Sequence, residues 1–518
     1  MAVSYKINER RVIPNWRDFK RTVALNELSS PGIPKPLVFD LSDKVNRWND
    51  EKTIASAADL INGAYIASSF GFEELGQAAT FVINNAERSS LPLLDIAYTL
   101  KSLPGPKAEN DEVYNPLEID SFMSFQSYVD NKLIYKVLAK TRRLTYQELI
   151  NPIYWVELSR LYAFMGNEQK AERAMIVAVN LAPNNRFVLR SATRMFVHFE
   201  QPEKALFYLR KSDILKHDPW LISAHIATSS IIERYSPLIK DGNKIITAKN
   251  HSNYELTELA STLATLEFSE GSIKKSKPLV SLAAISPNDN SLAQLEWLSG
   301  KESSFQFDPL KYTNVPNSFE AFAFEEYDRG NLVEAYNHSV NWFLDIPYSK
   351  RPVLFGSYLA TMRLRDDEKA IALCKAGLHA NPNDSSILNN LIYSLIVTNR
   401  INEAIPYIKL LPSTLKTEQL DNDSKITLLA TAGLIAFRSG NIDEGKAFYN
   451  RSLASAEKIK NEHLKNLALL NYYRELMLSK CQDANDIKGK ILSIDVKQFE
   501  DLALLKKEVL ELEHQQPA

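Results

Sequence analysis

The stretch "IYWVELSRLYAFMGNEQKAERAMIVAVNLAPNN", from Ile153 to Asn185, decides the fold of this chain. Its first half places an apolar stripe at helical spacing, formed by Trp155, Leu158, Ser159 and Tyr162. Gly166 and Asn167 then break the helix. The second half repeats the helical spacing with Ala171, Ala174, Met175 and Ala178 and stops at Pro183. We therefore predict two short helices joined by a tight turn, which cannot bury their apolar faces without neighbours.

The small residue of this hairpin recurs along the chain at a nearly constant interval. Ala171 is followed 34 residues later by Ala205. Farther on, Ala335, Ala370 and Ala404 are spaced 35 and 34 residues apart, and Gly445 takes the small position of the last unit. A fixed period of this length is typical of a stack of helix pairs, here from about residue 151 to residue 460.

This order of residues resembles the tetratricopeptide repeat, a family of 34-residue helix-turn-helix units. Ser159 departs from the pattern, which prefers glycine there. The resemblance implies an all-α, right-handed α-solenoid with an N-terminal helical region and a C-terminal capping helix. It also implies a non-catalytic scaffold or adaptor that binds a partner protein or peptide in its concave groove.

The repeat pattern divides the chain into six expected segments. They are a basic N-terminal arm (1–36), an N-terminal helical region of degenerate repeats or a separate helical domain (37–150), repeats (151–219), degenerate repeats with an irregular connection (220–316), further repeats (317–460), and C-terminal capping helices with a tail (461–518). In the last segment an apolar stripe contains Phe499, Leu502, Leu505, Val509 and Leu512. The stripe either caps the last repeat or forms a short coiled-coil seam in a dimer. The oligomeric state stays open.

Composition narrows the classes of partner and compartment. The formal net charge of −2 gives no general attraction to nucleic acid or acidic membranes. Only two cysteines occur, Cys374 and Cys481, which favours a reducing compartment over a disulfide framework. The N-terminus lacks a signal-peptide core, and the apolar runs are too short to span a bilayer. We expect a cytoplasmic protein that does not bind membranes.

Motifs that carry chemistry are missing from the sequence. No two of the eight histidines are four residues apart, so no helical zinc pair exists. The Gly-Lys pair in "SGKES" (299–303) lacks the glycine and the hydroxyl of a phosphate-binding loop. We expect no enzyme activity, no cofactor and no metal, with a catalytic activity hidden in residues 1–150 as the alternative.

The family resemblance also proposes binding residues, because the first helix of each repeat lines the concave groove. Carried onto this chain, the groove-facing positions are Arg160, Arg190, Arg194 and His198 early, and Phe324, Tyr327, Phe355, Tyr393 and Phe437 later, with Met362 and Asn389 among the later ones. The early groove would be basic and the later groove aromatic. In the alternative, the arginines pair with nearby glutamates and the aromatics pack between repeats. The family's clamp for chaperone tails is not matched at positions 156 and 160.

One basic run stands out near the N-terminus, "RRVIPNWRDFKR" at residues 10–21. In one interpretation Trp16 and Phe19 pack on the first hairpin while the arginines and lysines face water. In the other, the run docks an acidic partner or an RNA backbone. The second interpretation, together with the early arginines, supports the alternative function of a regulatory or RNA-binding subunit of a nucleic-acid-processing complex.

Overall fold

The computed structural model of the chain describes residues 12–19, 41–66, 72–89, 91–101, 133–248, 250–415 and 420–514. All regular elements within these ranges are helical, which confirms the predicted all-α class. The chain forms two compact units. Of the described residues, those up to 325 and those at 344–346 form the N-terminal unit, and those at 326–343 and from 347 onward form the C-terminal unit.

The helices of the N-terminal unit follow one another along the chain. They are α2 (Ser42–Glu51), α3 (Ile54–Ile66), α4 (Glu73–Asn84), α5 (Leu91–Lys101), α7 (Leu133–Gln147), α8 (Pro152–Phe164), α9 (Glu168–Leu181), α10 (Arg186–His198), α11 (Pro202–Arg210), α12 (Pro219–Ile231), α13 (Ile239–Ala248), α14 (Asn253–Ser269), α15 (Ile273–Ala283) and α16 (Asp289–Lys301). Irregular chain with one 3-10 turn (Pro309–Tyr312) leads to α17 (Phe319–Asp328), which ends in the C-terminal unit.

The C-terminal unit continues the same alternation. Its helices are α18 (Leu332–Asp345, whose last residues belong to the N-terminal unit), α19 (Lys350–Tyr358) with a π-helical turn (Leu359–Arg363), α20 (Asp367–Ala380), α21 (Ser385–Val397), α22 (Ile401–Leu415), α23 (Asn422–Arg438), α24 (Ile442–Lys458), α25 (Glu462–Leu478), α26 (Ala484–Leu492) and α27 (Ala503–His514).

Local chemistry explains why the opening stretch forms a hairpin. The side chain of Asn151 caps α8 by accepting a hydrogen bond from the backbone N–H of Ile153, and Asn167 caps α9 in the same way. Between the helices Gly166 adopts a φ of +64°, in the left-handed region that glycine tolerates. The predicted break at Gly166 and Asn167 is therefore confirmed.

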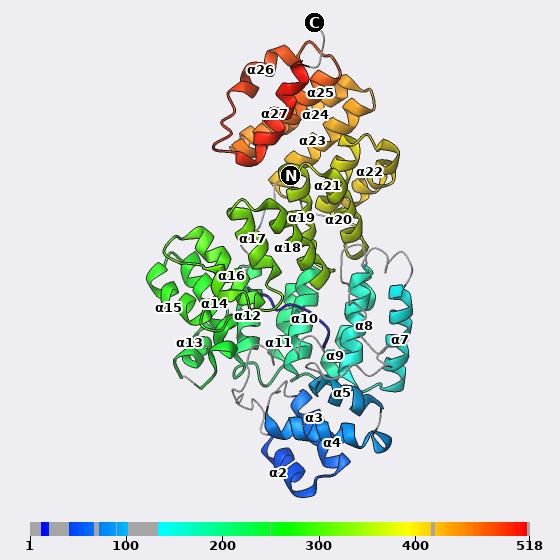
Figure 1. Cartoon of the computed structure of the whole chain (residues 1–518), viewed down its shortest axis with the longest axis vertical. Helices are drawn as coiled ribbons and strands as arrows, with labels where there is room; N and C mark the ends of the chain where they lie inside the picture. The colour runs from blue at the N-terminus through cyan, green and yellow to red at the C-terminus, as the bar shows by residue number, and fades with distance from the viewer. Residues whose placement is uncertain are drawn as a thin grey trace. The chain divides into compact units, whose positions relative to one another are not determined.

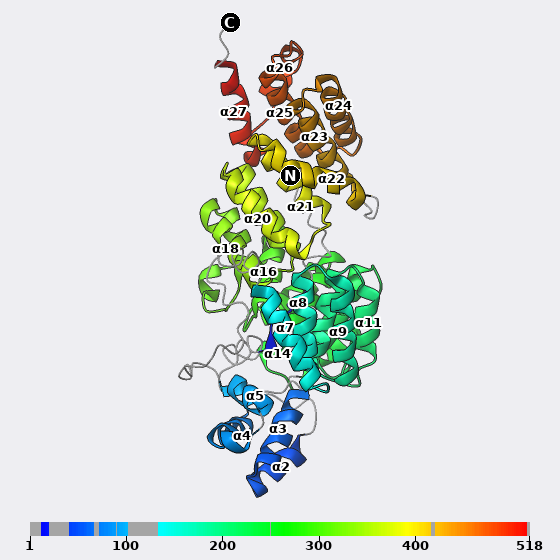
Figure 2. The same cartoon turned by 90° about the vertical axis from the view of Figure 1, so that its right-hand side faces the viewer.

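The small residues lie where the paired helices touch. Ala171, Ala205, Ala335, Ala370 and Ala404 are all buried, as the repeat period predicts. Ser159, which departs from the family pattern, also bonds across this helix contact. Its hydroxyl donates a hydrogen bond to the backbone carbonyl of Ala171 on α9 over 2.8 Å. The paired helices lie side by side, as α8 and α9 do in Figures 1 and 2.

Within each unit the first helices of successive pairs also contact one another. These first helices are α8, α10, α12, α14 and α16 in the N-terminal unit, and α19, α21, α23 and α25 in the C-terminal unit. We call the surface that they form in each unit the first-helix face. The groove positions predicted from the sequence lie on these helices and on α17, except Met362, which lies in the π-helical turn after α19.

The C-terminal stripe is a cap. Leu502, Leu505 and Val509 are fully buried, and α27 packs against α25 and the π-helical turn of its own chain. These three residues are therefore not available to a coiled-coil seam between two chains, whereas Phe499 and Leu512 of the same stripe are half-buried. None of the described helices combines the length and the apolar character needed to cross a membrane.

Candidate functional site

The first-helix face of the N-terminal unit holds an extended stretch of the chain itself. Residues 12–18 have no regular secondary structure, and residues 12–19 are buried except for the half-buried Asn15. We call residues 12–19 the N-terminal segment; it is the dark blue stretch beside α10 in Figure 1. Its hydrogen-bond partners lie on α8, α10, α16 and the end of α18, between 138 and 328 residues away in sequence.

An arginine anchors the segment between two carboxylates. The Nη2 atom of Arg17 lies 2.6 Å from Oδ2 of Asp289 and 2.5 Å from Oδ2 of Asp345, and its Nε donates to Asp345 over 3.0 Å. The exposed fractions of the three side chains are 7, 13 and 2%. Burial acts to lower the pKa of Arg17, but the two carboxylates hold that pKa well above its ordinary value. We call Asp289 and Asp345 the Arg17 cradle.

Polar contacts fix the segment on either side of Arg17. Asn15 donates to Asp289 over 2.6 Å and accepts from Nη2 of Arg194 over 3.1 Å. The backbone carbonyl of Ile13 accepts from Nδ2 of Asn290 over 3.1 Å. At the other end, the ring of Phe19 meets the ring of Phe187 edge-on at 5.2 Å. The face thus recognises backbone, amide, cationic and aromatic groups of one extended peptide.

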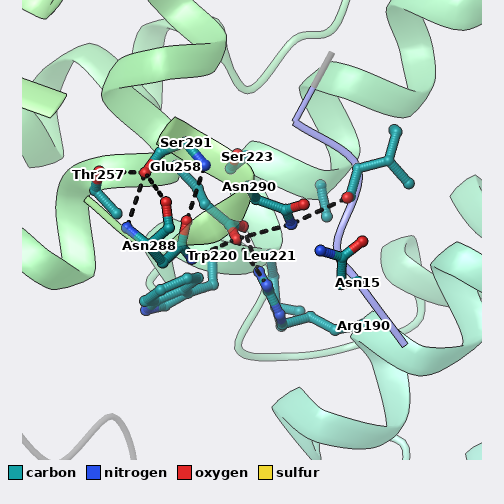
Figure 3. A network of polar contacts seen from close by, with 12 residues as sticks. Asn15, Arg190, Trp220, Leu221, Ser223, Thr257, Glu258, Asn288, Asn290 and Ser291 are labelled. Atoms are coloured by element: carbon teal, nitrogen blue, oxygen red, sulfur yellow. Dashed lines mark hydrogen bonds and ion pairs between the residues drawn. The ribbon is translucent and has the colours of Figure 1, made fainter. Parts of the chain in front are cut away.

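A buried glutamate near the segment holds Arg190, Asn288 and Asn290, and the last of these touches the segment (Figure 3). Glu258 on α14 is 0% exposed, and its carboxylate accepts from both terminal nitrogens of Arg190 at 2.6 and 2.9 Å. The same carboxylate accepts from Asn288 at 2.8 Å and from Asn290 at 3.2 Å. Since Asn290 also donates to the carbonyl of Ile13, Glu258 orients a direct contact of the segment.

The four early residues predicted from the sequence have different environments. Arg160 is buried and donates to Glu157 at 2.7 Å, and Arg190 lies over the ring of Trp220 while it pairs with Glu258. Arg194 contacts the segment through Asn15, whereas His198 is half-buried against Phe199. The positive charge expected of the early groove is offset by glutamates that the sequence did not single out. The expectation that the arm's basic residues face water is wrong for Arg17, because the cradle buries it.

The later aromatic residues mostly pack within the helix layers. Phe324 and Phe355 are buried, and Phe437 is buried against Tyr449 and Tyr472. Tyr327 is half-buried, its hydroxyl 3.1 Å from that of Tyr358 and its ring 5.7 Å from that of Phe355. Tyr393 is half-buried and lines a pocket.

That pocket lies on the first-helix face of the C-terminal unit. The hollow measures about 400 Å³ when the open solvent at its mouth is counted, and the centre of a water-sized sphere can occupy only about 30 Å³ of it. It is lined from α21, α23, α24 and α25 by Asn389, Tyr393, Ile426, Thr427, Ala430, Thr431, Tyr449, Leu464, Leu467, Ala468 and Asn471. Tyr393 donates to Oδ1 of Asn471 over 2.8 Å. Asn389 is only 5% exposed, and its Oδ1 has no hydrogen-bond partner. A buried amide oxygen of this kind calls for a donor from outside the chain, a water or a ligand.

The pocket and the occupied face use the same positions of their helices. Asn389 and Tyr393 are the fifth and ninth residues of α21, as Arg190 and Arg194 are of α10. In α10 the ninth residue contacts the N-terminal segment directly, and the fifth is linked to it through Glu258 and Asn290. The repeat therefore presents equivalent positions to a bound peptide in one unit and to a pocket in the other.

Groups suited to catalysis or metal binding are sparse in the described parts of the chain. No group of three or more His, Cys, Asp or Glu side chains stands there in a geometry that could hold a metal ion. Burial raises the pKa of the Cys374 thiol to about 12, so this sulfur stays protonated at neutral pH.

The fold and the face together define an all-α protein of tetratricopeptide-like helix pairs. Neither a protein-family model nor a curated protein matches this chain. Solved structures similar to it include yeast Tom70, with 13% identity over 76% of this chain and 94% of that one and a TM-score of 0.29. The human IFIT1 dimer with PPP-AAAA shares 16% identity over 72% of this chain and 89% of that one, with a TM-score of 0.36. The APC/C hetero-tetramer Cut9–Hcn1 shares 12% identity over 95% of this chain and 94% of that one, with a TM-score of 0.38. At such low identities and TM-scores, none of the three structures indicates what this chain binds.

Proposed function

We propose that this chain is a non-catalytic protein-interaction scaffold that holds an extended segment of a partner protein on its first-helix face. One observation carries the proposal. In the N-terminal unit this face holds the N-terminal segment, of which residues 12–18 have no regular secondary structure, through its backbone and its side chains. A surface with these contacts has the chemistry to bind an extended segment of another protein.

The pocket at α21, α23 and α25 is the proposed site for the partner. Its walls are apolar at Ile426 and Leu467, and its polar groups are Asn389, Tyr393 and Asn471. Oδ1 of Asn389 would accept from an N–H or O–H group, while the apolar walls would bury the body of the same side chain. The proposed occupant is therefore an extended segment that inserts one side chain with an apolar body and a donor at its tip.

A display experiment tests this proposal even though the partner is unidentified. Random peptides are selected against the full chain, and the dissociation constant of an enriched peptide is measured by fluorescence anisotropy. Tyr393→Ala should weaken binding about 30-fold, since a buried anchor commonly contributes about 2 kcal/mol or more. Asn389→Leu should weaken binding as well. It should also raise thermal stability, because it removes a buried acceptor that has no partner.

The matched control is Ile405→Ser, on the second helix α22, where Ile405 is an exposed apolar residue. This change should leave the dissociation constant unaltered. If the enriched peptides bind all four chains equally, or if selection enriches none, the first-helix face of the C-terminal unit is not a binding surface.

RNA binding, the alternative that the sequence allowed, is not part of this proposal. Arg17, Arg160 and Arg190 all face carboxylates of their own unit, so their charges are already neutralised. Binding of a phosphate backbone depends on cations that can replace its counterions.

A further inference from the structure

The N-terminal segment is held by chemistry that selects one kind of residue. Arg17 presents its guanidinium edge to Asp345 through Nε and Nη2, and Nη2 also reaches Asp289. This fork geometry suits the planar guanidinium of arginine and not the point charge of a lysine. Because the side chain of Asp345 is 2% exposed, an uncharged replacement for Arg17 would remove the charge that Nε and Nη2 bring to a buried carboxylate.

Aromatic residues complete the recognition on both sides of Arg17. Trp16 is buried directly before it, and Phe19, two positions after it, packs edge-on against Phe187. Aromatic residues and arginines that are buried at an interface are the groups that most often dominate its binding energy. The face is thus complementary to a short extended sequence with an arginine between aromatic residues.

The N-terminal segment lies on the helices as a bound peptide would, and it is not itself part of a helix pair. It is extended, while the elements around it are paired helices that pack on one another. Departure of the segment would break the contacts to Asp289, Asp345, Arg194 and Asn290 but would leave every described helix paired. Its covalent attachment gives it an effective concentration on the order of mM, which an external peptide must overcome.

Building on the proposed function, we propose that residues 12–19 are a built-in competitor on the first-helix face of the N-terminal unit. The Arg17 cradle is a second recognition site, and its external ligand is an extended protein segment that carries an arginine between aromatic residues. The chain's own segment occupies the cradle until such a partner displaces it.

The test uses two labelled synthetic peptides and full-length chains. One peptide is VIPNWRDF, the sequence of residues 12–19, and the other carries the Arg17→Ala change. They are titrated against the wild type, Arg17→Ala, and Arg17→Ala combined with Asp345→Asn. Fluorescence anisotropy reports binding, and circular dichroism reports the helical content of each chain. Asn15→Ala is a milder variant, which keeps the ion pairs and loses only the contacts of Asn15 to Asp289 and Arg194.

The inference predicts that the Arg17→Ala chain binds VIPNWRDF at least about tenfold more tightly than the wild type does, because its own segment competes poorly. On that chain the Arg17→Ala peptide should bind at least about tenfold more weakly, and Asp345→Asn should remove the preference for arginine. If Arg17→Ala lowers the helical content, the same ranking of the two peptides should appear on the Asn15→Ala chain.

Two results would overturn the inference. One is the absence of saturable binding of VIPNWRDF to any helical variant, which would make the segment a permanent part of the N-terminal unit. The other is equal binding of both peptides, which would mean that the cradle does not select arginine. Neither result decides whether Tyr393→Ala and Asn389→Leu weaken the binding of the display-selected peptides, so the proposed function is tested separately by those pocket variants.

Discussion

Gly445 in α24 offers a sharp test of how closely the paired helices approach. A Cβ atom at this position would lie 2.4 Å from Cδ2 and 2.8 Å from Cε2 of Phe437 on α23. Phe437 cannot swing aside freely, because it is buried against the rings of Tyr449 and Tyr472. Gly445→Ala should therefore force the two helices or the ring apart. Overpacking of this kind costs roughly 1–3 kcal/mol, against a gain of about 1 kcal/mol from better helix propensity.

The matched control is Gly489→Ala in α26, where a new Cβ would meet nothing within 4 Å. This change should keep only the propensity gain and stabilise the C-terminal unit by roughly 0.5–1 kcal/mol. For a unit of this size 1 kcal/mol corresponds to about 2–4 °C in the melting temperature. Differential scanning calorimetry should show Gly445→Ala melting below the wild type and Gly489→Ala above it. If Gly445→Ala raises the melting temperature as much as the control does, α23 and α24 do not pack as described.

Three further predictions concern buried groups. Ala205→Leu and Ala370→Leu should each lower the free energy of unfolding by roughly 1–3 kcal/mol, measured by urea denaturation, because both sites are buried at helix contacts. Deletion of residues 499–518 should uncover apolar surface of α25 and cause aggregation, which light scattering detects. No shift from dimer to monomer should precede this aggregation. Burial, and secondarily the charge of Arg210, lowers the pKa of His225 to about 4, so this side chain is neutral in the folded state at neutral pH. The stability that neutral His225 contributes is complete above a pH of about 6.5 and is lost as the pH falls toward 4. The loss amounts to up to about 3 kcal/mol in the free energy of unfolding. His225→Gln should therefore reduce the pH dependence of unfolding in this range.

The helix pairs were predictable because their signals are local. The turn at Gly166, the cap at Asn167 and the small residue Ala171 all lie within one hairpin, and the period repeats the pattern along the chain. The burial of Ala370 and Ala404 follows from the same register. Each of these features depends on residues a few positions apart, which a single sequence displays directly.

The occupied face could not be predicted, because its contacts join distant parts of the chain. Arg17 meets Asp289 and Asp345, which lie 272 and 328 residues away. The sequence shows a basic run near the N-terminus but does not show which of the many carboxylates faces it. The role of Glu258 could not be predicted either, since in the sequence it looks like any glutamate on a helix surface. Only the three-dimensional structure reveals that its carboxylate is buried beneath Arg190 and Asn290.

Photocrosslinking at the pocket tests most directly whether the first-helix face binds an extended partner segment. A benzoylphenylalanine is placed at Thr427, a half-buried residue of the pocket lining, and in a second chain at Ile405 on α22. Each chain is irradiated with the tightest peptide from the display selection, and the products are identified by mass spectrometry. Our account predicts a crosslink from position 427 that disappears when Asn389→Leu is added, and none from position 405. Equal crosslinking from both positions, or crosslinking from 405 alone, would contradict it.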